Sequence, residues 1–317
     1  MAEELFNNFI NIICEIAEFY RFEGKCDAAM LFLSSIKPII DSEDIKKQDK
    51  ARYLIQFAKI TSDHKFLKDF NYDDEMRMLK EAIELAESSN AKAVLADAVD
   101  LFGNCIYRQG ILEGAFQEAK EYYDKALSIR SLINDKLGLS KSYFHLGLYH
   151  ENKKETTDID KQTAFEYYQK GLEIAEEENF KLEQSYLYRH LAFYYSFYKE
   201  DLDKGLEYHK KSTELREEIG FRFSLQFAYF AVAFVYFLKN DFDNARDYFL
   251  KAYSAAVNAD RIEALKVLIF RRGEAIARGK GKSAALNYYQ TLLEAAKNIK
   301  DIGTIEELEL KIKELRK

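Results

Sequence analysis

The chain has 317 residues, of which 48% are hydrophobic, and it carries a formal net charge of −7 with a pI near 5.5. This acidic balance argues against a nucleic-acid partner, because proteins that bind nucleic acid usually present a basic surface. The three cysteines, Cys14, Cys26 and Cys105, form no pair with metal-ligand spacing. Their sparse, odd number and the lack of a signal peptide predict a cytoplasmic protein with reduced thiols.

The predicted elements are helices throughout, and the single proline of the chain permits them to be long. Turns that contain Asn, Asp or Gly separate them, because these residues tolerate the left-handed backbone that closes a helix. A last amphipathic helix is expected at 304–317, with Thr304 and Glu307 as a capping box. The helices before it are expected at 3–22, 27–40, 47–61, 75–88, 92–108, 117–133, 138–152, 162–178, 182–198, 204–218, 222–238, 242–257, 261–278 and 283–298.

Two markers recur along these helices with the same period of 40 to 46 residues. One is a small residue, with a large residue four positions later and, in most copies, a small one after seven. Its first positions are Ala29, Glu75 in a weaker form, Ala119, Ala164, Gly205, Ala245 and Ala285. The other is a large–small pair at Ile16-Ala17, Phe57-Ala58, Phe102-Gly103, Leu146-Gly147, Leu191-Ala192, Val232-Ala233 and Arg272-Gly273. Such a period predicts stacked helical hairpins, since one hairpin cannot bury its apolar stripe alone.

These markers resemble the tetratricopeptide repeat family, most clearly in Tyr143, Leu146-Gly147, Ala164, Tyr168 and Gly171. The resemblance covers nearly the whole chain in about seven copies, with a period longer than the ~34 residues of the common form. The longer step is similar to that of kinesin light chains, MalT-like regulators and peptide-sensing regulators of Gram-positive bacteria. It implies an all-α fold, a right-handed superhelical array of about seven hairpins with a C-terminal capping helix.

The resemblance also implies a domain organisation. The whole chain, residues 1–317, is expected to form one solenoid. Its weakest repeats lie in 1–90, its regular repeats in 91–300 and its capping helix in 304–317.

Three pairs with the pattern Asp-x-Asp could in principle hold a divalent metal, because paired carboxylates suit Mg or Mn. Each pair stands where a second helix is expected to begin, so helix capping is the favoured interpretation. The pairs are Asp158/Asp160, Asp201/Asp203 and Asp241/Asp243. No metal site and no cofactor are predicted.

No constellation of residues suggests catalysis. The glycine- and lysine-rich segment 279–283 lacks the spacing of a phosphate-binding loop, and no strand precedes it. The histidines are scattered at His64, His145, His150, His190 and His209. The sequence therefore predicts no catalytic residue and a protein that is not an enzyme.

The most apolar stretch, Phe221–Leu238, is shorter than the ~20 residues that a membrane span requires. It also keeps the phase of the repeats. A core helix is therefore expected here, and no contact with a membrane.

In the family that this chain resembles, the first helix of each hairpin lines a concave groove, and aromatic, Arg and Asn side chains there suit an extended peptide. The alternative for the late aromatics is packing against the seventh hairpin and the terminal helix. A carboxylate clamp is not supported, because Asp100 stands where a lysine would precede Asn104. By the family's spacing, the groove residues are Arg52, Lys59, Asn104, Lys141, Phe144, Tyr186, Arg189, Phe193, Phe227, Phe230 and Phe234.

The sequence thus predicts a cytoplasmic interaction module or scaffold that binds a peptide or protein segment in its groove without performing chemistry. One alternative is a peptide-sensing bacterial regulator, although repeats begin almost at Met1, where such regulators usually carry an effector segment. Another is a non-catalytic subunit of an enzyme or signalling complex.

Overall fold

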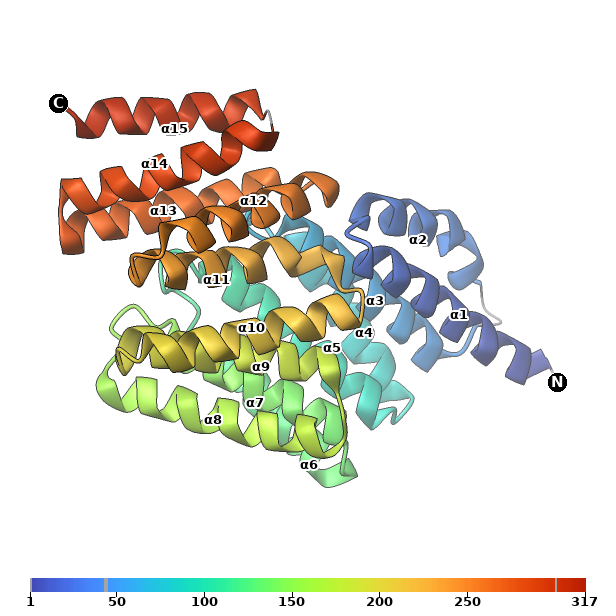
Figure 1. The fold of residues 1–317 in the computed structure, drawn as a ribbon. Coiled ribbons are helices and arrows are strands. Elements are labelled where there is room, and N and C mark those ends of the chain that lie inside the picture. Colours follow the sequence, from blue (N-terminus) through green and yellow to red (C-terminus); the bar gives the residue numbers. More distant parts are fainter. Residues whose placement is uncertain (1, 43–44, 300) are drawn as a thin grey trace. The chain divides into compact units, whose positions relative to one another are not determined.

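The computed structural model describes residues 2–42, 45–299 and 301–317, and over these residues it contains fifteen α-helices and no β-strand (Figure 1). The predicted all-α helical-repeat fold is confirmed. The helices pair in chain order into seven hairpins, and the fifteenth follows the last hairpin. They are α1 (Ala2–Phe22), α2 (Cys26–Ile40), α3 (Lys47–Lys65), α4 (Asp73–Ser88), α5 (Lys92–Gly110), α6 (Ala119–Ile133), α7 (Lys136–Glu151), α8 (Asp158–Glu177), α9 (Lys181–Phe193), α10 (Leu202–Glu218), α11 (Leu225–Leu238), α12 (Phe242–Asn258), α13 (Ile262–Lys280), α14 (Lys282–Ile299) and α15 (Ile302–Leu315).

Two short helical turns interrupt the regular pattern. A π-helical turn, η1 (Tyr194–Tyr198), extends α9, and a 3₁₀ turn, η2 (Arg222–Ser224), precedes α11. The helix predicted at 182–198 is therefore present, but its last turn is wound more loosely than an α-helix.

The chain divides into two compact units, Met1–Leu187 and Tyr188–Lys317. In the first unit each helix from α1 to α7 packs on the next, and the first helices of successive hairpins, α1, α3, α5 and α7, also contact one another. The prediction of one continuous array over 1–317 stays a prediction, and each unit is described by itself below.

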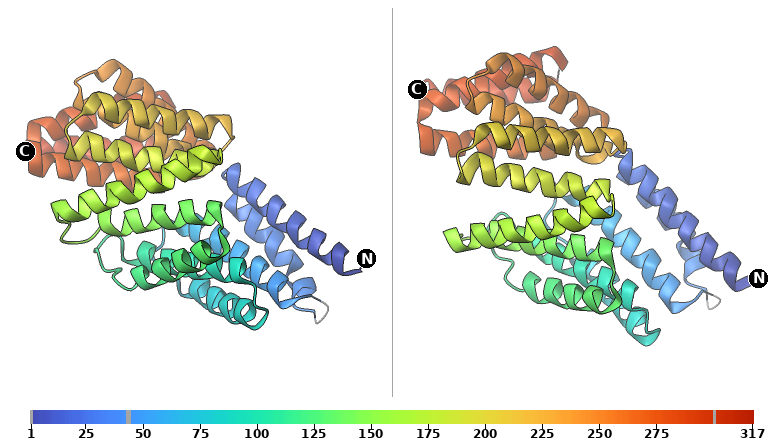
Figure 2. Two further views of the ribbon diagram at one scale, coloured as in Figure 1. Left: turned by 90° about the horizontal axis from the view of Figure 1, so that it is seen from below. Right: turned by 60° about the horizontal axis from the view of Figure 1, so that its bottom comes forward.

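The second unit departs from this packing order at its seventh hairpin. Here α14 packs against α12, the second helix of the preceding hairpin, as well as against its own partner α13 and the final helix α15. Figure 2 shows the helices of this unit lying side by side. The core of the unit gathers aromatic residues of α11, α12 and α14, among them Phe234, Phe249 and Tyr288. The apolar helix α11 is thus a core helix, as predicted, with Val232 and Ala233 fully buried.

The small residues of the repeat markers lie where helices cross closely. A Cβ atom added to Gly147 would come within 2.3 Å of the Tyr168 ring, and one added to Gly273 within 2.1 Å of the Tyr289 hydroxyl. In each case the glycine lies on the first helix of a hairpin and the tyrosine on the second helix of that hairpin. The missing side chain therefore creates the space that the aromatic ring of the partner helix fills, and this fit sets the register of the hairpin.

The helix ends follow the predicted turn chemistry. Asn90, Asn134, Asn179 and Asp260 adopt positive φ between 50° and 56° after second helices, and Gly220 does so at 69°. Left-handed residues at these positions close a helix and turn the chain toward the next one.

The Asp-x-Asp pairs act in helix capping. Asp201 accepts a hydrogen bond from the Lys204 amide at 3.0 Å, and Asp241 accepts one from the Asn244 amide at 3.2 Å. At α8 the cap is Thr157, and Asp160 completes a capping box with it. The side chains thus satisfy amide groups that have no partner inside the helix.

The capping box predicted at Thr304 and Glu307 is wrong. Residue 301 precedes α15, and Thr304 is a buried residue whose hydroxyl donates to the Asp301 carboxylate at 2.5 Å. Glu307 instead accepts a hydrogen bond from Lys266 of α13 at 2.7 Å. The helix begins two residues earlier than predicted, which places Thr304 inside it.

The close fit at Gly147 gives a first prediction. Replacing Gly147 with Leu would force the Tyr168 ring out of its place, so we expect the free energy of unfolding to fall by at least about 1–3 kcal/mol, the usual cost of overpacking. Chemical denaturation measures the loss. The control is Gly279→Ala, because Gly279 lies in helix α13 with open space around it. This control should gain about 0.5–1 kcal/mol through helix propensity. An unchanged stability of Gly147→Leu would contradict the register described here.

Candidate functional site

A row of polar and aromatic side chains follows the first helices of the first unit. We name this row the first-helix face. All of its members are partly buried and partly open to solvent. They are the predicted groove residues Arg52 and Lys59 on α3, Asn104 on α5, Lys141 and Phe144 on α7, and Tyr186 on α9.

The structure brings several of these residues together. The rings of Phe144 and Tyr186 stack with centroids 5.5 Å apart. Burial, Arg21 and Lys141 all lower the pKa of Lys59, which places Lys59 and Lys141 within electrostatic reach of each other. Tyr186 likewise interacts electrostatically with Arg21 of α1. Cations from three helices and an aromatic pair thus converge on one region of the first-helix face.

A network of charged side chains lies behind this region and was not predicted. Arg21 donates to the Glu18 carboxylate at 2.5 Å and to the Asp63 carboxylate at 3.0 Å. Arg108 lies 2.7 Å from the other oxygen of Asp63, and Lys59 donates to Glu18 at 3.0 Å. These residues come from α1, α3 and α5, so the network joins the first three first helices of the unit.

The charges of this network stabilise one another. Burial opposes the ionisation of Glu18 and Asp63, but the cations outweigh it and hold the pKa of both carboxyl groups below the usual range. For Glu18 these cations are Lys59 and Arg21, and for Asp63 they are Arg108 and Arg21. Each carboxylate therefore stays charged and keeps the first helices linked.

The other two groove predictions in this unit are Arg52 and Asn104. Arg52 donates a hydrogen bond to the Asn11 side chain of α1 at 2.5 Å. Asn104 lies on α5, which packs between α3 and α7. Asp100, one turn before Asn104, is buried and engaged by Arg130 at 3.3 Å and His145 at 3.0 Å. Asp100 is therefore committed to internal ion pairs.

In the second unit the predicted groove residues separate into two groups. Arg189 and Phe193 are half-buried, and the Arg189 guanidinium lies 5.1 Å from the Phe193 ring. Phe227, Phe230 and Phe234 are only 5%, 6% and 4% exposed. The latter three belong to the core of the unit rather than to an open groove.

The physical reason is the altered packing of the seventh hairpin. Tyr288 of α14 meets the Phe234 ring edge-on with centroids 5.9 Å apart, and Phe249 of α12 lies against Phe230 at 5.6 Å. The late aromatics thus pack within the array, which was the alternative to partner binding.

Three further residues in this region were not among the predicted groove residues. Phe197, on the π-helical turn, is 41% exposed and stacks on Phe193 at 5.9 Å. His209 is 2% exposed and meets Phe193 edge-on at 4.8 Å. Arg272 lies 5.0 Å from the Phe197 ring. A signal was present for Arg272, because it replaces the apolar residue of the large–small marker.

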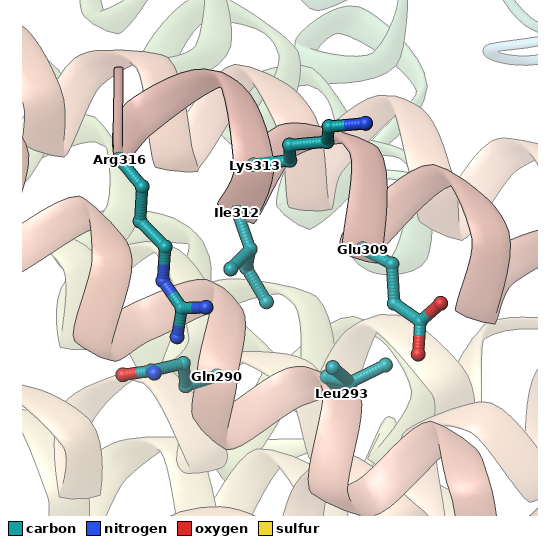
Figure 3. Close-up of a pocket in the computed structure, with 6 residues that line it drawn as sticks. All are labelled: Gln290, Leu293, Glu309, Ile312, Lys313 and Arg316. Atoms are coloured by element: carbon teal, nitrogen blue, oxygen red, sulfur yellow. The ribbon is translucent and has the colours of Figure 1, made fainter.

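A shallow hollow of about 430 Å³ lies between α14 and α15 (Figure 3). Leu293 and Ile312 form its apolar part, and Glu309, Lys313 and Arg316 form its charged rim. Charges of both signs at the rim do not select one kind of ligand.

Two further properties bear on possible chemistry. Over residues 2–42, 45–299 and 301–317, no group of three or more His, Cys, Asp or Glu side chains is arranged to hold a metal ion. Across the same residues, no helix combines the length and the apolar character that crossing a bilayer requires.

Comparison with known proteins identifies the fold. No protein-family model matches the sequence, and no curated protein matches it. Among solved structures, a signal-transduction ATPase with numerous domains and a tetratricopeptide-repeat sensor, from Pyrococcus horikoshii, matches with a TM-score of 0.56 and 15% identity. The match covers 98% of this chain and 47% of that one, so the chain spans about half the length of the archaeal protein.

A second solved structure matches along its whole length. A Rap protein in complex with competence and sporulation factor gives a TM-score of 0.54 and 12% identity over 98% of both chains. At such identities the likeness concerns the fold. The chain has an all-α helical-repeat fold similar to that of the tetratricopeptide-repeat sensor, and the resemblance seen in the sequence is confirmed at the level of the fold.

The buried network predicts that Asp63 contributes more to the free energy of unfolding than Asp124, whose ion pair is exposed. Asp63→Ala would leave Arg21 and Arg108 with less counter-charge at sites only 2% and 16% exposed. We expect a loss of about 3–5 kcal/mol in the free energy of unfolding. Asp124→Ala is the control, because its ion pair with Lys120 is largely exposed and should be worth under about 1 kcal/mol. Urea denaturation of both variants checks the difference, and equal losses would contradict a stabilising role for the network.

His209 predicts a pH dependence of stability. Burial lowers the pKa of His209 well below its usual value, and the positive charge of Arg189 lowers it further. The folded protein therefore keeps this histidine neutral, whereas the unfolded chain takes up a proton near pH 6.5. Stability should fall as the pH decreases below about 6.5, by at most about 1.4 kcal/mol per pH unit for this group. His150, whose pKa burial also lowers, acts in the same direction.

The variant His209→Phe tests this assignment. It keeps a ring against Phe193 but cannot bind a proton, so its melting temperature should fall less than that of the wild type between neutral and mildly acidic pH. Thermal denaturation followed by circular dichroism measures both slopes. Equal slopes would show that His209 is not the titrating group.

Proposed function

We propose that this chain is a non-catalytic interaction module that binds an extended peptide or protein segment along the first-helix face. The observation that carries the proposal is the partial exposure of all six members of this face, on four successive first helices. Cations, an amide and aromatic rings in one row offer partners to a peptide backbone and pockets to its side chains.

The arrangement also supports tight binding by a few anchors. Phe144 and Tyr186 stack as a rigid pair, and Lys141 lies one helical turn before Phe144. Interfaces obtain most of their binding energy from such aromatic and cationic anchors. The buried network of Glu18, Arg21 and Asp63 holds the helices of the face in place, which lowers the entropy cost of binding.

The histidines support a role without catalysis. His145 Nδ1 lies 3.0 Å from the Asp100 carboxylate and His150 Nδ1 lies 3.0 Å from the Asp160 carboxylate, so both rings make internal hydrogen bonds. A peptide-sensing regulator and a non-catalytic subunit of a larger complex both require the same binding face. They differ in the identity of the partner, and the proposal is common to both.

A random peptide library tests the proposal. Peptides are selected on the purified chain and their affinities are measured for wild type and for the double variant Lys141→Ala/Tyr186→Ala. We expect the double variant to lose at least about tenfold in affinity, which is about 1.4 kcal/mol.

The control is Lys125→Ala/Leu132→Ala on α6, where the two side chains are 51% and 72% exposed and removal also deletes one cation and one large apolar group. It should bind like the wild type. Failure to select any peptide, or equal binding by a double variant that melts at the wild-type temperature, would overturn the proposal.

A further inference from the structure

The seventh repeat carries a charge at a position that is apolar in every other repeat. The first residue of its large–small pair is Arg272, which lies on α13. The equivalent residues of the other six repeats are Ile16, Phe57, Phe102, Leu146, Leu191 and Val232. Arg272 thus brings a guanidinium group to a place where the repeat pattern asks only for apolar contact.

The surroundings of Arg272 are aromatic rather than acidic. Its guanidinium lies 4.6 Å from the Phe234 ring and 5.0 Å from the Phe197 ring. In the part of the chain that the structure describes, Arg272 has no carboxylate within ion-pair distance. Burial lowers the pKa of Arg272, as expected for a charge removed from water without a counter-ion. A half-buried charge without a counter-ion costs free energy, which the contacts with the two rings offset in part.

Other cations surround the same place. His209 is buried, and within the described residues its Nε2 atom has no hydrogen-bond partner. Burial is the main cause that lowers the pKa of His209, and Arg189, Arg216 and Arg272 lower it further. Three arginines thus lie within electrostatic reach of His209, although the chain as a whole carries a net charge of −7.

The place is open to solvent on one side. Phe197 is 41% exposed, while Phe193 and Arg272 are half-buried. Phe197 owes its position to the π-helical turn Tyr194–Tyr198, and turns of this kind are frequent at functional sites. We name the surface formed by Phe193, Phe197 and Arg272 the arginine–aromatic patch.

We infer that the arginine–aromatic patch binds an acidic peptide segment, with a carboxylate on Arg272 and the apolar side chain of a neighbouring peptide residue on Phe197. The inference rests on the proposed function, because it requires that the chain binds peptide segments. A guanidinium presents two parallel N–H donors to a carboxylate, and the arginines within electrostatic reach of His209 add long-range attraction. Binding would supply the counter-charge that the chain itself does not place there.

Two synthetic peptide pools of equal length test the inference. In one pool, every peptide contains Glu and aromatic residues in random order. The other pool has the same peptides with Gln in place of every Glu. The wild type should bind the Glu pool at least about tenfold more tightly at low salt, and added salt should reduce the difference. Equal binding of the two pools would overturn the inference.

The decisive variant is Arg272→Leu, which restores the apolar residue of the other repeats. It should keep the fold, retain affinity for the Gln pool and lose the preference for the Glu pool. Arg272→Lys keeps the charge but not the fork of donors, and should retain only part of the preference. The control is Arg278→Leu, an exposed arginine in the last turn of the same helix, which should behave like the wild type. Retention of the Glu preference by Arg272→Leu would overturn the inference.

A second variant covers the case in which Arg272→Leu does not fold. Phe197→Ala removes an exposed ring, and it should weaken binding of the Glu pool by about tenfold in a chain with wild-type helix content. Unchanged binding would count against the patch.

The two proposals fail separately. Peptides that still depend on Lys141 and Tyr186 but not on Arg272 would remove only this inference. Peptides that depend on Arg272 but not on Lys141 and Tyr186 would remove only the first-helix face.

Discussion

The closeness of two helices within each hairpin is the constraint on which this structure depends. At Gly147 the backbone of one helix lies so near the Tyr168 ring that no β-carbon fits between them, and Gly273 meets Tyr289 in the same way. An aromatic ring fills the space that glycine leaves, so the pair works only in one register. The large–small marker keeps a small residue, glycine or alanine, at this position in all seven repeats.

Within this common frame the two units stabilise their first helices by different means. In the first unit, Glu18, Arg21, Asp63 and Arg108 link helices through buried charges. In the second unit, aromatic rings of α11 and α14 take that place, with Phe234 and Tyr288 in edge-on contact. Buried charges stabilise the fold only when every partner is in position. The same architecture can therefore present a polar face in one unit and an arginine among aromatic rings in the other.

Local patterns allowed most of the fold to be predicted. The period of the markers located the hairpins, and Asn134 and Asn179 marked the left-handed ends of helices. Asp63 shows where this reasoning stops. The helix predicted at 47–61 continues to Lys65, so Asp63 was assigned to a connection although it lies on α3 and pairs with Arg21, 42 residues away. Such a pair depends on the register of helices that are distant in sequence.

The candidate site was predictable to a similar extent. Lys59, Lys141, Phe144 and Tyr186 lie on a shared, partly exposed face, whereas Phe230 and Phe234 are covered. Their burial follows from α14 packing against α12, a long-range choice that the sequence of α11 does not reveal. Arg272 was visible in the sequence as a break in the marker, but only the structure shows the rings around it.

The charged network that joins α1, α3 and α5 has a consequence for how this chain can evolve. Repeat proteins commonly lengthen or shorten by duplicating or deleting one hairpin, because each hairpin contacts only its neighbours. Removing the second hairpin here would delete Asp63 and leave Arg21 and Arg108 facing each other across the new junction. Inserting a hairpin next to the second one would separate Asp63 from one of its two arginine partners. The first three hairpins are therefore expected to be inherited as one block, and changes in repeat number to occur elsewhere in the chain.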